Sequence, residues 1–143
     1  MIEFDQVWLD DRARCRWALR GLDLAVEAGM LVAVVGDADD GGPDAVLDLV
    51  AGRRLPERGR VVIDGVDLRD LDRREHRRSV VELELQPGGE RRLCLPQATM
   101  LAVRPSPSTL ADADLVVVLS DGLEVAAAER APAKAGLMSR CTR

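Results

Sequence analysis

The segment from Gly36 to Asp44 has the spacing of a phosphate-binding loop but not its chemistry. Gly36 and Gly41 stand five positions apart, as do the two glycines of the pattern GxxxxGK[ST]. In that pattern the backbone N–H groups and the lysine hold phosphate, and the serine or threonine hydroxyl holds Mg²⁺. Here Gly42 occupies the lysine position and Pro43 the hydroxyl position. The segment therefore predicts a phosphate-loop backbone without the side chains that bind a nucleotide.

Carboxylates make the same segment unfavourable for an anion. The candidate site comprises Gly36, Asp37, Ala38, Asp39, Asp40, Gly41, Gly42, Pro43 and Asp44, and four of these residues are aspartates. At an intermediate dielectric, each carboxylate–phosphate contact costs about 1 kcal/mol or more. The start of a helix attracts an anion by at most about 2 kcal/mol. We therefore expect no cofactor. The aspartates could instead hold Ca²⁺ or Mg²⁺, but they lack the ligand spacing of an EF-hand, and we expect no metal.

Hydrophobic patterning predicts the elements around this loop. Residues 31–35, LVAVV, form a short apolar run typical of a buried strand, and a helix begins near Pro43 and stops at Gly52. Alternation predicts strands at 2–9, with a bulge at 5–6, and at 19–26. A hairpin is expected at 60–68, centred on Asp64-Gly65. Further strands are expected at 79–85, 99–103 and 115–119, the last followed by an Asp121-Gly122 turn and a return strand.

Composition limits the class of protein. A chain of 143 residues suits one domain, which we place at 1–128 with a loose tail at 129–143. The net charge of −5 argues against a nucleic-acid partner. Three cysteines without a CxxC pair, no long apolar run and no leader pattern fit a cytoplasmic protein. The segment 69–78 is expected to be a solvated charged surface, with His76 exposed.

Longer stretches add a family resemblance. WALRGLDLAVEAGMLVAVVG and LVAGRRLPERGRVVIDGVDLRDLD, both within residues 2–68, resemble the N-terminal half of an ATP-binding-cassette (ABC) nucleotide-binding domain of exporter type. The resemblance implies a P-loop NTPase-like α/β core with a mixed sheet and an antiparallel N-terminal layer. It also implies an adenine-stacking aromatic near Asp11. Trp8 and Trp17 flank that place, and we interpret both as packing residues.

The C-terminal half resembles the same family in eroded form. LQPGGERRLCLPQA is similar to the family's signature motif, with Pro87, Gly88, Gly89 and Glu90 as the remnant. Pro87 replaces the serine that contacts the partner's γ-phosphate. The chain leaves no room before Pro87 for the family's helical subdomain. Residues 103–105 align with the switch histidine and contain none, and the Walker B candidates, 99–103 and 115–121, lack Asp-Glu.

The resemblance implies three functions, which stay open here. The first is a non-catalytic cassette homologue that docks on, or regulates, a transporter ATPase and reaches a membrane only through that partner. The second is a transporter ATP-binding subunit that retains weak nucleotide binding, with ATP and Mg²⁺ as ligands. The third is a decayed gene product without function. Open sheet edges left by the missing subdomain also suggest a transporter subunit or a homodimer as partner.

Overall fold

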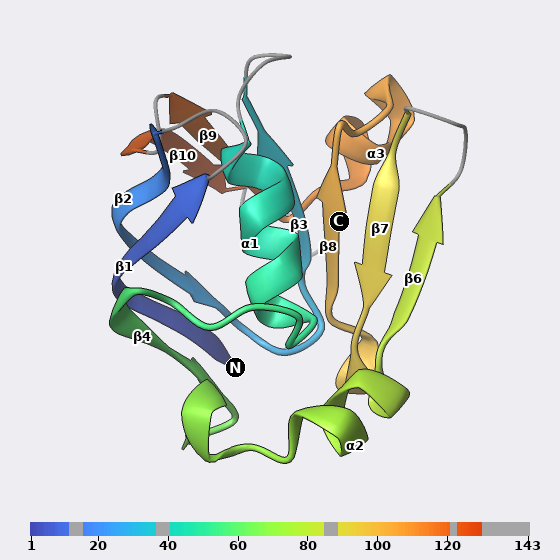
Figure 1. Ribbon diagram of the computed structural model, residues 1–143. Coiled ribbons are helices and arrows are strands. Elements are labelled where there is room, and N and C mark those ends of the chain that lie inside the picture. The colour runs from blue at the N-terminus through green and yellow to red at the C-terminus, as the bar shows by residue number, and fades with distance from the viewer. Residues whose placement is uncertain (12–15, 37–40, 85–88, 121–122, 130–143) are drawn as a thin grey trace.

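Helix α1, Gly42–Val50, lies between two β-sheets (Figure 1). The computed structural model describes residues 1–11, 16–36, 41–84 and 89–120, together with the backbone of 123–129. The layered α/β architecture, with a mixed sheet and an antiparallel N-terminal sheet, confirms the predicted fold class. The proposed tail boundary is not tested: strand β10 continues to Glu129, and the residues after it lie outside the described part.

The first sheet is antiparallel and has the order β2-β1-β4-β5. Its strands are β1 (Ile2–Asp11), β2 (Arg16–Val26), β4 (Arg58–Ile63) and β5 (Val66–Asp67). The predicted bulge in β1 is confirmed: Gln6 has φ 47°, and the pairing register shifts between Phe4 and Val7. The bulge turns Val7 and Leu9 back toward the interior, where both are fully buried. The predicted hairpin at Asp64-Gly65 is also confirmed, and both residues have positive φ.

The second sheet is mixed and has the order β10-β9-β3-β8-β7-β6. Its strands are β3 (Leu31–Val35), β6 (Val81–Glu84), β7 (Arg91–Cys94), β8 (Met100–Val103), β9 (Leu115–Ser120) and β10 (Leu123–Glu129). Strand β3 runs parallel to β8 and β9, and the outer strands are antiparallel to their neighbours. Strand β7 was not predicted, because its sequence RRLC lacks an apolar pattern.

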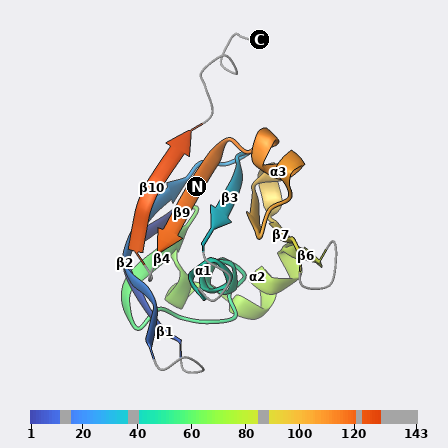
Figure 2. The same cartoon turned by 90° about the horizontal axis from the view of Figure 1, so that it is seen from above.

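The hydrophobic core fills the space between the sheets on both sides of α1. The helix contributes Val46, Leu47, Leu49 and Val50, all fully buried, and it contacts β2 in one sheet and β8 and β9 in the other. Figure 2 shows α1 end-on between the layers. Strand β10 contacts β2, so the sheets meet along that side, whereas β6 forms the opposite edge of the mixed sheet (Figure 2).

Short helices connect the remaining strands. They are η1 (Leu68–Asp70), α2 (Arg73–Ser79), η2 (Pro96–Ala98) and α3 (Pro107–Asp112). Helix α2 has no buried residue and was not predicted, since it has no apolar period. Its start is fixed instead by Asp72, which accepts hydrogen bonds from the N–H groups of Arg74 and Glu75. The charged surface expected at 69–78 is therefore confirmed, but part of it is helical.

Candidate functional site

The predicted strand before the loop and the predicted helix after it are both present, and glycine at position 36 lets them meet. Gly36 follows strand β3, and a Cβ added there would lie 3.1 Å from Pro43 Cγ and 3.3 Å from the carbonyl oxygen of Leu119. Pro43 lies in the first turn of α1, where a missing N–H costs little, and Gly41 caps the helix without a side-chain hydrogen bond. Residues 37–40, which carry the other three aspartates and Ala38, lie outside the described part.

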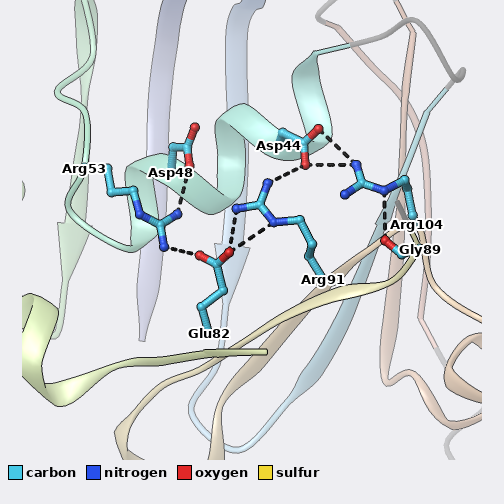
Figure 3. A network of polar contacts seen from close by, with 7 residues as sticks. All are labelled: Asp44, Asp48, Arg53, Glu82, Gly89, Arg91 and Arg104. Carbon is cyan, nitrogen blue, oxygen red and sulfur yellow. Dashed lines mark hydrogen bonds and ion pairs between the residues drawn. The ribbon is translucent and has the colours of Figure 1, made fainter. Parts of the chain in front are cut away.

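Asp44 lies in the first turn of α1 and is held by two arginines (Figure 3). Its Oδ1 accepts a hydrogen bond from Arg91 Nη1 at 3.0 Å, and its Oδ2 accepts one from Arg104 Nη1, also at 3.0 Å. The negative charge that Asp44 adds at the helix start is therefore compensated by Arg91 and Arg104. Sequence reasoning missed both guanidinium groups, which come from elements far along the chain.

The pairing continues from Asp44 across the surface of α1. Arg91 Nη2 lies 2.7 Å from Glu82 Oε2, Arg53 also pairs with Glu82, and Arg53 Nη1 lies 3.0 Å from Asp48 Oδ1 (Figure 3). We call the whole set the α1 ion network; it comprises Asp44, Asp48, Arg53, Glu82, Arg91 and Arg104. Carboxylates and guanidinium groups alternate along it, so the charges cancel within the network.

The α1 ion network joins the helix to strands β6 and β7, at the edge of the mixed sheet. Asp44 and Asp48 belong to α1, Glu82 to β6 and Arg91 to β7, while Arg104 follows β8 and donates through Nε to the carbonyl oxygen of Gly89 at 2.9 Å. Burial alone would raise the pKa of Glu82, but hydrogen bonds from Arg91 and Arg53 outweigh burial and lower it. The network therefore favours the ionised form of Glu82 and fixes α1 against β6 and β7.

Glu90, from the predicted signature remnant, forms a second cluster. Its side chain is only 4% exposed and lies 2.9 Å from Arg92 Nη2. Its Oε1 accepts hydrogen bonds from Ser106 N at 2.8 Å and Thr109 Oγ1 at 2.7 Å, at the start of α3. Successive strand residues point to opposite faces, which explains why Arg91 reaches α1 and Arg92 reaches α3. Glu90 thus holds α3 on the sheet from inside the protein.

Gly89, the other described residue of the signature remnant, lies just before Glu90 and strand β7. Gly89 accepts the hydrogen bond from Arg104, whereas Pro87 and Gly88 lie outside the described residues. Strands β6 and β7 pair antiparallel at the place where the sequence leaves no room for a helical subdomain. Gly89 and Glu90 therefore lead into a strand.

The region aligned with the switch histidine carries a permanent cation instead. Val103 is buried at the end of β8, and Arg104 follows with a positive φ of 50°. Both Walker B candidates form strands beside β3, but Val103-Arg104 supplies no carboxylate after β8. Asp121, which follows β9, lies outside the described residues. Among the described residues, no group of three or more His, Cys, Asp or Glu side chains could hold a metal ion.

Two other expectations concern His76 and the tryptophans Trp8 and Trp17. His76 is half-buried rather than exposed: its Nε2 lies 2.7 Å from the carbonyl oxygen of Val50, at the end of α1, so the prediction was wrong. Such a contact satisfies one of the carbonyls that a helix C-terminus leaves open. Trp8 and Trp17 contact each other edge to face at 5.2 Å, and the Arg58 guanidinium lies 5.8 Å from the Trp8 ring centre. Their predicted packing role is confirmed.

Sequence comparison relates about half of the chain to bacterial transport proteins. The chain is 38% identical over 73 residues to the mycobactin import ATP-binding/permease protein IrtB of Mycobacterium tuberculosis H37Rv. The aligned segment covers 51% of this chain and 12% of that protein. The chain is 36% identical over 85 residues to IrtB of Mycolicibacterium thermoresistibile, covering 59% and 14%. The chain thus spans a small part of these relatives. No family model matches the sequence.

Structural comparison extends the likeness over most of the chain. A dimeric structure of MJ0796, a bacterial ABC transporter cassette, superposes with a TM-score of 0.68 at 12% identity, covering 90% of this chain and 98% of that chain. A bacterial Atm1-family ABC exporter with ATP bound gives 0.67 at 17% identity, covering 90% and 38%. At these identities the superposition establishes the fold. No helix in the described residues is long and apolar enough to cross a membrane.

Proposed function

Because the chain is a homologue of the ATP-binding cassettes of ABC transporters, we propose that it is a non-catalytic cassette that docks on, or regulates, a transporter ATPase. The observation that carries this proposal is the pair of internal salt bridges at the start of α1. Asp44 holds Arg91 and Arg104 there, so both of these cations already have an internal carboxylate as partner. Such a cassette requires no cofactor.

The chemistry of nucleotide hydrolysis supports the non-catalytic half of the proposal. Hydrolysis requires a cation on the β- and γ-phosphates, a ligand for Mg²⁺ and a group that orients the attacking water. Gly42 and Pro43 supply neither the ammonium nor the hydroxyl. For Arg91 or Arg104 to meet a phosphate, the contacts with Asp44 would have to break first. Exposed ion pairs are individually weak, but two guanidinium groups share this carboxylate.

The preserved architecture supports the docking half. The chain retains a cassette fold over 90% of its length, with the core around α1 intact. IrtB combines ATP-binding and permease parts under one name, whereas this chain matches only 12% of it. We therefore assign to this chain neither permease activity nor a substrate. A cassette surface without hydrolysis is suited to pairing with an intact transporter subunit, and such a partner would bring the chain to the membrane.

One observation favours a second candidate function. Arg91 and Arg104 place two positive charges at the start of α1, and guanidinium groups bind phosphate well. A transporter subunit that binds ATP weakly, through these arginines and the loop backbone, is therefore the alternative. It differs from the first proposal in requiring a measurable affinity for nucleotide.

Thermal denaturation with MgATP separates the two. A ligand that binds only the native state raises stability, and a site with Kd of about 1 mM would add about 1.4 kcal/mol at about 10 mM ligand, or roughly 4 °C in Tm. We expect no shift for the natural chain. The double variant G42K/P43T restores the missing groups and serves as the positive control. A saturable, Mg²⁺-dependent shift in the natural chain would establish the alternative instead.

Docking is tested with the intact ABC ATPase encoded nearest to this chain. We expect a stoichiometric complex on size-exclusion chromatography and a changed ATPase rate of the intact subunit when the purified chain is added. The chain alone should show no ATPase activity. Absence of a complex with such subunits, at concentrations where cassette pairs associate, would rule out the docking role.

A further inference from the structure

We propose that two copies of the chain associate through strand β6, paired antiparallel about a twofold axis at Glu82. Strand β6 is the last strand of the mixed sheet, and no described strand pairs with its outer side. The other end of that sheet is different, because β10 contacts β2. An open edge presents backbone N–H and C=O groups that can pair with another strand. The proposal goes beyond the docking role and does not depend on it.

The exposed side chains of β6 are apolar on one face. Val81 is 55% exposed and Leu83 is 44% exposed, and residues two apart lie on the same face of a strand. In the register with β7, Val81 lies opposite Cys94 and Leu83 opposite Arg92. Arg92 is paired with Glu90, so this face of the hairpin presents no unpaired guanidinium beside Leu83. An apolar patch at a strand edge is favourable only when another surface covers it.

A twofold axis makes this edge complementary to itself. When Glu82 lies opposite Glu82 of the second copy, antiparallel pairing places Val81 opposite the partner's Leu83, and Leu83 opposite the partner's Val81. The two apolar side chains of one copy then cover those of the other copy. A register shifted by one residue would place Leu83 opposite Glu82 and lose this match.

The Glu82 carboxylates at the axis do not oppose this register. Two carboxylates directly opposite each other would normally repel. Each Glu82 is already paired with Arg53 and Arg91, so each strand brings a neutralised carboxylate to the axis. The short length of β6 limits the contact area, and we expect a weak dimer with a dissociation constant between micromolar and millimolar.

Sedimentation equilibrium of the full chain, from micromolar to millimolar concentration, tests the proposal. We expect a concentration-dependent monomer–dimer equilibrium. Substitution Leu83→Lys should raise the dissociation constant at least about tenfold, because the symmetric interface contains each unfavourable Lys–Val contact twice. Val66→Lys is the matched control: Val66 is 40% exposed on β5, the edge strand of the other sheet, and its substitution should leave the dissociation constant unchanged.

Hydrogen exchange gives an independent readout. Amides of residues 81–84 should become more protected as the protein concentration rises, whereas amides of β5 should not. Far-UV circular dichroism and thermal melts must show that both lysine variants fold. A monomer at millimolar concentration would overturn the proposal. So would a dimer that Leu83→Lys leaves intact or that Val66→Lys disrupts.

Discussion

At the scale of single residues, Asp44 and Glu90 show how a carboxylate's surroundings decide its role. Asp44 lies at a helix start and neutralises two guanidinium groups. Glu90 is buried: its Oε1 accepts hydrogen bonds from Ser106 and Thr109 at the start of α3, and its Oε2 accepts one from Arg92 of β7. The sequence identifies both as acidic residues in motif-like segments, but their partners stand up to 60 residues away along the chain. Such pairings become visible only once the fold brings the elements together.

The substitution Asp44→Asn tests the role assigned to the carboxylate. It should lower the free energy of unfolding by about 1 kcal/mol, because Arg91 and Arg104 lose their shared anion while the groups stay partly solvated. Urea denaturation at low salt measures the change, which should shrink at high salt. Glu3→Gln is the control: Glu3 is an exposed carboxylate for which the described residues show no ion pair. An equal loss in both variants would contradict a specific role for Asp44.

At the scale of elements, strands and helices with an apolar pattern were predictable from sequence. Strand β3, helix α1 and the β4–β5 hairpin follow directly from the run 31–35, from Pro43 with Gly52, and from Asp64-Gly65. Strand β7 and helix α2 were not predictable, because their residues are largely charged. Strand β7 is stabilised by pairing with β6 and β8, and α2 by its Asp72 cap. Missing β7 also concealed Arg91, and with it most of the ion network.

The bulge in β1 requires glycine at position 59 on the neighbouring strand. Gly59 has φ +76°, and a Cβ there would overlap the carbonyl oxygens of Asp5 and Gln6. Gly59→Ala should therefore lower the free energy of unfolding by about 3 kcal/mol or more. Gly65→Ala is the matched control: its φ is +84°, but nothing lies within 4 Å of the added atom. It should cost only about 1 kcal/mol, the ordinary cost of a left-handed alanine. Equal losses in urea denaturation would refute the steric account.

At the scale of the whole molecule, two carboxylates link stability to pH. For both Glu82 and Glu90, burial alone would raise the pKa, but hydrogen bonds and nearby arginines lower it below the ordinary value of 4.5. A carboxyl with a lowered pKa stabilises the fold above its unfolded value. That contribution is lost as the pH falls through the folded value. We therefore expect the free energy of unfolding to fall in the acid range below 4.5.

Urea denaturation at a series of pH values measures this fall. The variant Glu90→Gln should be less stable at neutral pH and should lose less further stability on acidification, because it has one fewer carboxyl to protonate. A variant with the same acid slope as the natural chain would show that Glu90 does not contribute to the pH dependence.

The internal neutrality of the α1 ion network has a consequence for encounters with other molecules. Its three carboxylates and three guanidinium groups cancel, so the chain's net charge of −5 is carried by the rest of the protein. The network itself therefore adds no net charge to the long-range field of the molecule. A docking partner with a basic face would be attracted by the charges outside the network, and its rate of association would fall as salt is added.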